Sequence, residues 1–440
     1  NRSELIDPNY GKTSSVYNAF GEEISRTNPK EQTTTFTYDD YGRMTDRMDG
    51  GENINTHWNY FEDQQHKGLL ESVRYGDQGI SYAYDDFQRL ETTTDRGYTT
   101  SFTYDFASRI ASVTYPSGFT MNSLYKTTGH LYGYTDADGN MLWQTDDVSP
   151  RGELLQSTMG GNIVTNRSFH PEKHILTGVT TVAGENNLQN LTFGYDDFNN
   201  LEARIDNLRN LNESFRYDNL NRLTDIELNG VQTGMMTYDD YGRMTSKTMD
   251  GQLVFQGASF DGPEGKPHAI KSVETNEGVF PADRQDITYT SFDKVKTIVE
   301  GDNSLSYTYG YDRQRIGMVE TANGIRRSKT YVGNCEYVTE TADGVTTEKV
   351  LTYLSGPTGV FAVVEKQGEE ESLHYILKDH LGSWTTITDA EGNVEQELSY
   401  DAWGNLRDPE TWCSFSQAEP IEARTSVIPA QAGTSRRLHI

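Results

Sequence analysis

Cysteine, helical patterns and long apolar runs are all scarce in this sequence of 440 residues. The two cysteines, Cys335 and Cys413, make no disulfide framework, and we expect two free thiols rather than one bridge. No apolar run reaches the roughly 18 residues that a membrane-spanning helix needs. No stretch of about 12 residues carries the apolar spacing of an amphipathic helix. These absences argue against a disulfide-stapled module, a helical membrane protein and an ordinary helical enzyme.

Basic residues are also few, with 38 Lys and Arg against 66 Asp and Glu and a net charge of −28. Binding to phosphate needs a basic surface, so nucleic acid is not expected as a direct partner. The nine histidines lie scattered without metal-ligand spacing. We therefore expect neither a metal site nor a cofactor. The acidity is typical of a solvated surface or of a protein with a basic partner.

Tyrosine, phenylalanine and glycine are plentiful, with 27, 17 and 40 copies. The octapeptide "YDDYGRMT" stands at 38–45 and again at 238–245. Its relatives follow the pattern Tyr-Asp-x-aromatic-(Gly/Asn)-(Arg/Asn)-aliphatic and recur at a spacing typical of repeat architectures. They are "YDDFQRL" from Tyr84, "YDFASRI" from Tyr104, "YDDFNNL" from Tyr195, "YDNLNRL" from Tyr217, "YTSFDKV" from Tyr289 and "YDAWGNL" from Tyr400.

Each position of the phrase has a physical reason. The alternation in "TTTFTYD" at 33–39 predicts a half-buried strand, and the Asp predicts a turn whose backbone N–H groups it accepts. The fifth position favours residues that tolerate positive φ, with a bulge. Gln88 and Ser108 break this rule, so looser turns are expected there. The turn aromatics are expected to pack over the neighbouring hairpin; they are Tyr41, Phe87, Phe198, Tyr241, Phe292 and Trp403.

One phrase is thus one β-hairpin, which is marginal alone and gains stability by stacking on its neighbours. The sequence predicts an all-β protein in which repeated hairpins form one spiralling sheet. The predicted repeat anchors are Tyr38, Asp39, Gly42, Arg43, Tyr84, Asp85, Tyr104, Asp105, Tyr195, Asp196, Tyr217, Asp218, Tyr238, Asp239, Gly242 and Arg243. An open edge of such a sheet invites pairing with another part of a parent chain or with another copy.

These phrases resemble the YD or RHS repeats of bacterial RHS proteins, toxin-complex C subunits, wall-associated toxins and animal teneurins. The stretch 373–405 resembles the RHS-repeat-associated core. Its signature residues here are Asp379, His380, Leu381, Gly382, Asp389, Gly392, Tyr400, Trp403 and Gly404. The resemblance implies four parts: a partial N-terminal segment (1–30), a repeat array (31–372), the core (373–412) and a divergent, disordered tail (413–440).

The resemblance further implies a bacterial, secreted or cell-surface shell that encloses and delivers a C-terminal toxin polypeptide. That polypeptide belongs to a parent protein or to a neighbouring gene, and this chain is expected to be a fragment that lacks it. The family's self-cleavage motif is not found after the core, so no enzyme activity and no catalytic residue are predicted. The alternative is an adhesion module that binds surface glycans through exposed aromatic faces.

Two local patterns resemble a calcium-binding loop and a catalytic triad. "DADGN" at 136–140 resembles the start of a calcium loop, but Met141 occupies the position where that loop needs glycine, so we expect a plain turn. Asp379, His380 and Ser383 contain the letters of a catalytic triad, but residues so close in one turn rarely converge. We expect them to shape a turn of the core.

Overall fold

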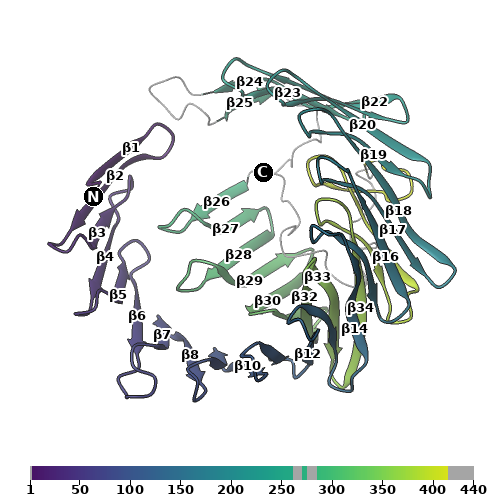
Figure 1. Cartoon of the computed structure of the whole chain (residues 1–440). Coiled ribbons are helices and arrows are strands. Elements are labelled where there is room, and N and C mark those ends of the chain that lie inside the picture. The colour runs from purple at the N-terminus through teal and green to yellow at the C-terminus, as the bar shows by residue number, and fades with distance from the viewer. Residues whose placement is uncertain (1, 261–269, 275–284, 415–440) are drawn as a thin grey trace.

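The computed structural model describes residues 2–260, 270–274 and 285–414, and within them the chain is made of β-strands and turns without a helix (Figure 1). The prediction of an all-β chain of repeated hairpins is confirmed. In this part of the chain there is accordingly no helix able to cross a membrane. The expected tail falls outside the described residues, apart from Cys413 and Ser414.

The strands form three antiparallel sheets of 25, 11 and two strands. The first sheet contains β1 (Glu4–Asp7), β2 (Gly11–Tyr17), β3 (Glu23–Thr27), β4 (Thr33–Tyr38), β5 (Met44–Asp49), β6 (Ile54–Tyr60), β7 (Leu70–Tyr75), β8 (Gln78–Tyr84), β9 (Leu90–Asp95), β10 (Tyr98–Tyr104), β11 (Ile110–Thr114), β12 (Thr120–Tyr125), β13 (Leu131–Thr135), β14 (Met141–Val148), β15 (Leu154–Met159), β16 (Ile163–Phe169), β17 (Leu176–Ala183), β18 (Asn186–Tyr195), β19 (Leu201–Asp206), β20 (Leu211–Tyr217), β21 (Leu223–Leu228), β22 (Val231–Tyr238), β23 (Met244–Met249), β24 (Gln252–Phe260) and β25 (Ile270–Glu274).

The second sheet contains β26 (Gln285–Tyr289), β27 (Val295–Glu300), β28 (Asn303–Tyr309), β29 (Arg315–Ala322), β30 (Ile325–Val332), β31 (Cys335–Ala342), β32 (Val345–Gly356), β33 (Gly359–Gln367), β34 (Glu370–Lys378), β35 (Trp384–Thr388) and β36 (Val394–Glu397). The third sheet pairs β37 (Ser399–Tyr400) with β38 (Leu406–Arg407).

Strand pairing follows chain order, because each strand of a sheet pairs antiparallel with the next. The result is a continuous ribbon of hairpins. In Figure 1, β1–β25 bend round most of a circle, and β26–β36 run on as a second stretch. We call these two stretches the first pass and the second pass.

The alternation predicted for 33–39 is confirmed in β4, where Phe36 and Tyr38 share the half-buried face and Thr33, Thr35 and Thr37 are exposed. The register shifts between Thr37 and Tyr38, and it shifts in the same place, just before the tyrosine, in β10 and β22. The predicted bulge therefore recurs where each strand enters its Tyr-Asp turn, and it increases the local twist that helps the ribbon to curve.

The hairpin turns alternate between the two rims of the ribbon. We call the rim that carries the Tyr-Asp turns, such as 39–43 and 85–89, the YD rim. The turns on the other rim, such as 50–53 and 96–97, form the opposite rim. Both rims are exposed backbone unless something covers them.

Where the passes meet, the YD rim of the second pass lies on the opposite rim of the first. The Ser291 N–H donates to Glu52 Oε1 at 2.8 Å, in the turn after β26 and the turn after β5 respectively. The next YD turn of the second pass contacts the same first-pass hairpin, where Arg313 Nη2 donates to Asp49 Oδ1 at 2.9 Å and Arg47 Nη2 donates to the Tyr311 carbonyl at 2.8 Å. Further along both passes, Arg96 Nη1 donates to the Ile316 carbonyl at 3.1 Å, so the seam follows the opposite rim of the first pass.

The largest apolar core lies along the same seam. Trp143 of β14, Phe361 of β33 and Tyr375 of β34 are each no more than 2% exposed, and Trp143 and Phe361 have ring centroids 6.3 Å apart. Residues from both passes fill this cluster. A single antiparallel sheet can bury only one face against a core, so stacking the passes supplies the second layer that the repeats need.

Candidate functional site

The Tyr-Asp phrases form one repeated four-residue turn. In the first copy, Asp39 Oδ1 accepts the backbone N–H groups of Tyr41 and Arg43, both at 2.9 Å. Its other oxygen accepts the Arg43 Nε–H at 2.7 Å. Gly42 lies in the left-handed region with φ of 76°, where glycine avoids the steric cost of a side chain. One carboxylate therefore closes the turn through three donors.

The same capture of an arginine by the turn aspartate recurs along the rim. It joins Asp85 with Arg89, Asp105 with Arg109, Asp218 with Arg222 and Asp239 with Arg243, each with an Nε–H to Oδ2 distance of 2.7 Å. After Tyr195 the arginine is replaced by Asn200, whose amide donates to Asp196 Oδ2 at 2.8 Å. Asn200 therefore keeps the hydrogen bond that closes the turn but lacks the positive charge of the arginine.

The looser turns expected at Gln88 and Ser108 are wrong. Both residues adopt the left-handed conformation, with φ of 63° and 60°, and both turns keep the full set of aspartate hydrogen bonds. A side chain other than glycine costs roughly 1–2 kcal/mol in this conformation. The charge-assisted bonds to Asp85 and Asp105 offset that cost.

Eight tyrosine hydroxyls in the described residues tie a turn to the one before it. Tyr104 at the end of β10 donates to the carbonyl of Leu90, which opens β9, at 2.7 Å, and Tyr238 donates to Leu223 at 2.8 Å. The other pairs are Tyr38 with Glu23, Tyr60 with Met44, Tyr84 with Leu70, Tyr125 with Ile110, Tyr217 with Leu201 and Tyr309 with Val295. These bonds run from hairpin to hairpin along the YD rim.

The turn arginine reinforces the same link. The Arg89 guanidinium lies 4.4 Å from the ring centroid of Tyr104, and Arg222 lies 4.6 Å from that of Tyr238. A cation over an aromatic ring is worth about 0.5–1 kcal/mol at exposed sites. The aspartate of one turn thus orients an arginine, and that arginine holds the tyrosine of the next turn.

The packing expected of the turn aromatics is mostly wrong. Phe292 and Trp403 do pack against neighbouring side chains. The other four stand out from the YD rim of the first pass with exposed fractions between 74% and 78%; they are Tyr41, Phe87, Phe198 and Tyr241. Three of these rings have the guanidinium group of their own turn arginine over one face, at 4.9 to 5.3 Å from the ring centroid; they are Tyr41, Phe87 and Tyr241.

The core signature residues shape three more turns of the same kind. The Asp379 carboxylate accepts the N–H groups of Leu381 and Ser383, both at 2.9 Å, and Asp389 accepts that of Asn393 at 2.8 Å. The glycines at 382, 392 and 404 all have positive φ. At Gly392 a side chain is also excluded by space, because an added Cβ would lie 2.7 Å from the Ala183 Cβ.

Three of the four remaining signature residues contact the first pass, and the fourth, Leu381, is exposed. His380 has its ring 4.4 Å from that of Phe193, and burial lowers its pKa below the ordinary value. Leu381 is 77% exposed. The Tyr400 carbonyl accepts a hydrogen bond from Arg204, and Trp403 joins an apolar cluster of β20–β23.

A buried ionic cluster fixes the end of the described chain to the first pass. Glu213 of β20 is 2% exposed and accepts two hydrogen bonds from Arg407 of β38, at 2.8 and 3.1 Å, and others from Arg204. Trp412 lies under both guanidinium groups. Burial acts to raise the pKa of Glu213, but the two arginines hold it below its usual value. The glutamate therefore stays ionised and joins segments almost 200 residues apart.

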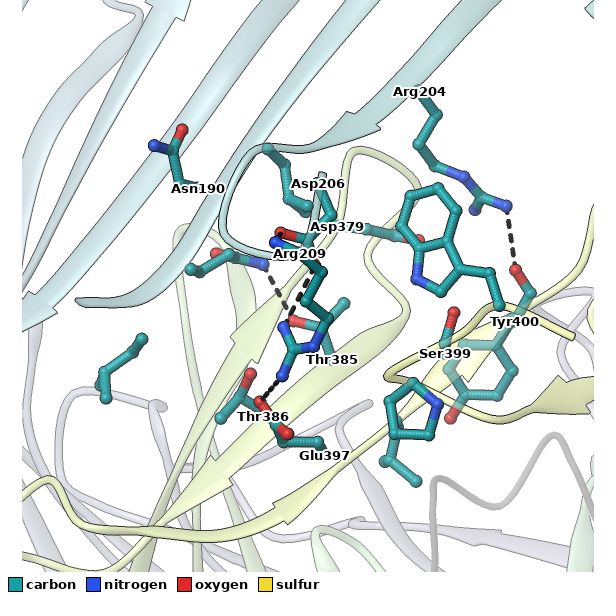
Figure 2. A pocket seen from close by; sticks show the side chains of 16 residues that line it. Asn190, Arg204, Asp206, Arg209, Asp379, Thr385, Thr386, Glu397, Ser399 and Tyr400 are labelled. Carbon is teal, nitrogen blue, oxygen red and sulfur yellow. Dashed lines mark hydrogen bonds and ion pairs between the residues drawn. The ribbon is translucent and has the colours of Figure 1, made fainter. Parts of the chain in front are cut away.

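A small cavity adjoins this cluster, and Figure 2 shows its polar lining. Arg209 reaches across it to Glu397, with 2.5 Å between Nη2 and Oε1, and Gln189 Nε2 donates to Thr385 at 2.9 Å. The volume of about 50 Å³ suits one or two ordered waters. The cavity is too small for a substrate. We therefore interpret its lining residues as a contact that holds separate segments of the chain together.

Asp379, His380 and Ser383 do not form a catalytic triad, since Ser383 contacts Asp379 through its backbone N–H. A different set has the right order of contacts. Ser372 Oγ lies 2.9 Å from His374 Nε2, and Glu395 Oε2 lies 2.5 Å from His374 Nδ1. None of the three lines either cavity. Their contacts tie β36 to β34, and the sequence showed only the Ser-x-His spacing.

The other candidates are structural. The Asp136 carboxylate accepts the N–H groups of Asp138 and Asn140 at 3.0 and 2.8 Å, so this loop is a turn closed by its own backbone. Within the described ranges, no three His, Cys, Asp or Glu residues gather as metal ligands. Cys335 and Cys413 are free thiols, the first buried and the second exposed.

The tyrosine ties can be tested with two residues of one phrase. Replacing Tyr238 by Phe removes the hydroxyl that donates to the Leu223 carbonyl. We expect a loss of about 1 kcal/mol, seen as roughly fivefold faster amide exchange in β21 and β22. Tyr241→Phe is the matched control, because its ring is 78% exposed. Equal exchange rates in the two variants would contradict the role given to the Tyr238 hydroxyl.

The turn carboxylates predict a loss of stability in acid. The Arg89 hydrogen bond lowers the pKa of Asp85 below its ordinary value of 3.8, and Arg109 does the same for Asp105. A lowered pKa in the folded state stabilises the fold above the unfolded pKa, and this is lost as pH falls through the folded value. We expect the thermal midpoint to hold above about pH 5 and to fall progressively below pH 4. Asp85→Asn should flatten this dependence, whereas a wild-type midpoint unchanged down to about pH 3 would rule it out.

Comparison with known proteins agrees with the repeat geometry. The family model of the RHS repeat matches residues 17–51. No curated protein matches the sequence. Three solved structures cover almost the whole chain.

The crystal structure of TcdB2-TccC3-TEV superposes with a TM-score of 0.75 at 15% identity and covers 93% of this chain and 24% of its own. The TcdB2-TccC3 structure without its hypervariable C-terminal region gives 0.77 at 14%, covering 94% and 25%. The Tc holotoxin pore of Photorhabdus luminescens with a mutated TccC3 gives 0.76 at 15%, covering 92% and 24%.

The chain spans about a quarter of the length of these structures. At such low identity the likeness establishes the fold. The matched repeat and the recurring Tyr-Asp turns identify the residues that produce this shared fold. The chain therefore contains a match to the RHS repeat at residues 17–51 and shares its fold with the TcdB2-TccC3 structures.

Proposed function

We propose that this chain is a non-catalytic wall segment of a bacterial RHS-type toxin, which encloses and delivers a C-terminal effector polypeptide. The observation that carries the proposal is the seam between the two passes, since a ribbon that stacks on itself can build a closed wall. The repeat anchors from Tyr38 to Arg243 would hold the wall. Residues 31–372 would form its array and 373–412 its closing core, with β34 running across the division.

The partner would be the toxin polypeptide of the parent protein or of a neighbouring gene, and the assembly would be secreted or held at the cell surface. One of the similar structures supports this, because it is a TcdB2-TccC3 complex without its hypervariable C-terminal region. The buried cluster of Glu213, Arg204 and Arg407 would keep the closing core on the first pass.

Encapsulation can be tested by protease protection. The chain is co-expressed with the polypeptide encoded directly downstream, and the digestion half-life of that polypeptide is measured with and without the chain. We expect about tenfold slower digestion with it, because cleavage follows the open population. Arg407→Ala leaves Glu213 buried with one arginine fewer and should shorten the half-life. Equal half-lives with and without the chain would contradict encapsulation.

Glycan binding is the second candidate, favoured by a cavity of about 320 Å³ at the seam. Tyr75, Tyr311 and Tyr331 contribute aromatic surface to it, and Gln78 and Asp312 contribute polar groups. Such a lining could stack on a sugar and bond its hydroxyls.

A glycan array tests this candidate. Binding by the wild type should be lost in Tyr311→Ala and kept in Tyr289→Ala, a tyrosine outside the cavity. An array without any binder would remove the candidate and leave the wall proposal standing.

A further inference from the structure

The YD rim of the first pass carries a row of exposed apolar side chains. Six of them occupy the same turn position and the seventh the position before it, with exposed fractions from 68% to 100%. They are Phe20, Tyr41, Phe87, Phe106, Phe198, Leu220 and Tyr241. They fall into three groups, Phe20 with Tyr41, Phe87 with Phe106, and Phe198 with Leu220 and Tyr241, and within each group consecutive YD turns are two strands apart, or about 10 Å. A monomer rarely leaves so much aromatic surface in contact with water.

The second pass shows what covers this kind of rim. Its own YD rim lies on the opposite rim of the first pass, where Ser291 bonds to Glu52 and Thr352 donates to Ser117 at 2.7 Å. Tyr311 stands at the same turn position as Phe106 but is half-buried, with its ring 6.4 Å from that of Trp58 in the first pass. The cover of a YD rim in this fold is therefore the opposite rim of another pass.

The chain also carries a second opposite rim, on the second pass. Its turns at 301–302, 323–324, 343–344 and 368–369 are exposed, and beside them Val345 is 66% exposed. These turns repeat the spacing of the opposite-rim turns that already serve the seam, one for every two strands. One molecule thus presents both halves of the same interface.

We propose that a second copy of this chain docks its second-pass opposite rim onto the first-pass YD rim, continuing the internal seam from one molecule to the next. The contact joins two different surfaces, so it can repeat and build an open stack. This goes beyond the wall function, and encapsulation could hold or fail independently. The net charge of −28 opposes the approach of two copies, so the stack forms when salt screens that charge.

Sedimentation velocity tests the proposal. The wild type should be monomeric at low salt and associate at about 0.5 M NaCl, in proportion to protein concentration. The triple variant Tyr41→Ser, Phe87→Ser and Phe106→Ser should associate at least about tenfold more weakly, since apolar burial drives the contact. Serine keeps the backbone N–H groups that the turn aspartates accept. The control Met48→Thr with Met235→Thr removes exposed apolar groups from strands instead of the rim, and should associate like wild type.

A mixing experiment separates a seam from unspecific adhesion. Val345→Asp alters only the opposite rim of the second pass. This variant by itself should also fail to stack. A mixture of this variant with the triple variant retains one intact pair of rims, so dimers should appear and grow no further. A wild type that stays monomeric at every salt and protein concentration would overturn the proposal and assign the rim to a ribbon from a different polypeptide. Association of both variants at wild-type strength would overturn it as well.

Discussion

The capture of each turn by its own aspartate is the constraint on which the ribbon depends. One carboxylate accepts two backbone N–H groups and a side-chain donor, so a four-residue reversal is closed within five residues. The captured arginine then lies against the next tyrosine, whose hydroxyl reaches back to the carbonyl that follows that arginine. The hydrogen bonds that close each turn and the contacts that join successive hairpins therefore form one network. The spacing of the Tyr-Asp phrases in the sequence sets the spacing of the hairpins in the sheet.

This network explains how a chain with only 34% hydrophobic residues stays ordered. Each hairpin buries little, so stability comes from nearest-neighbour links that repeat along the rim. The buried apolar core is concentrated where the passes meet, around Trp143 and Phe361. Polar contacts between successive hairpins stabilise the ribbon along its length, and apolar packing holds one pass against the other.

The closing segment uses a costlier interaction. Burying Glu213 with two arginines carries a large desolvation penalty, which only close and complete pairing offsets. Such a cluster adds less to stability than to specificity, because a shifted register would leave a charge buried without its partner. It suits a place where the chain has to join one particular hairpin of an array of similar ones.

The repeats, the all-β class and the turn positions followed from the sequence, because they rest on interactions within five residues or between successive hairpins. The phrase even outweighed the poor turn residues Gln88 and Ser108, since the aspartate bonds are local and strong. Contacts such as Glu213 with Arg407 and His374 with Glu395 could not be predicted, because they depend on which hairpins face each other after the ribbon has curved. The same holds for the turn aromatics. Phe106 and Tyr311 occupy equivalent turn positions, yet only Tyr311 lies against another pass, with its ring 6.4 Å from that of Trp58, so only tertiary structure decides which ring is buried.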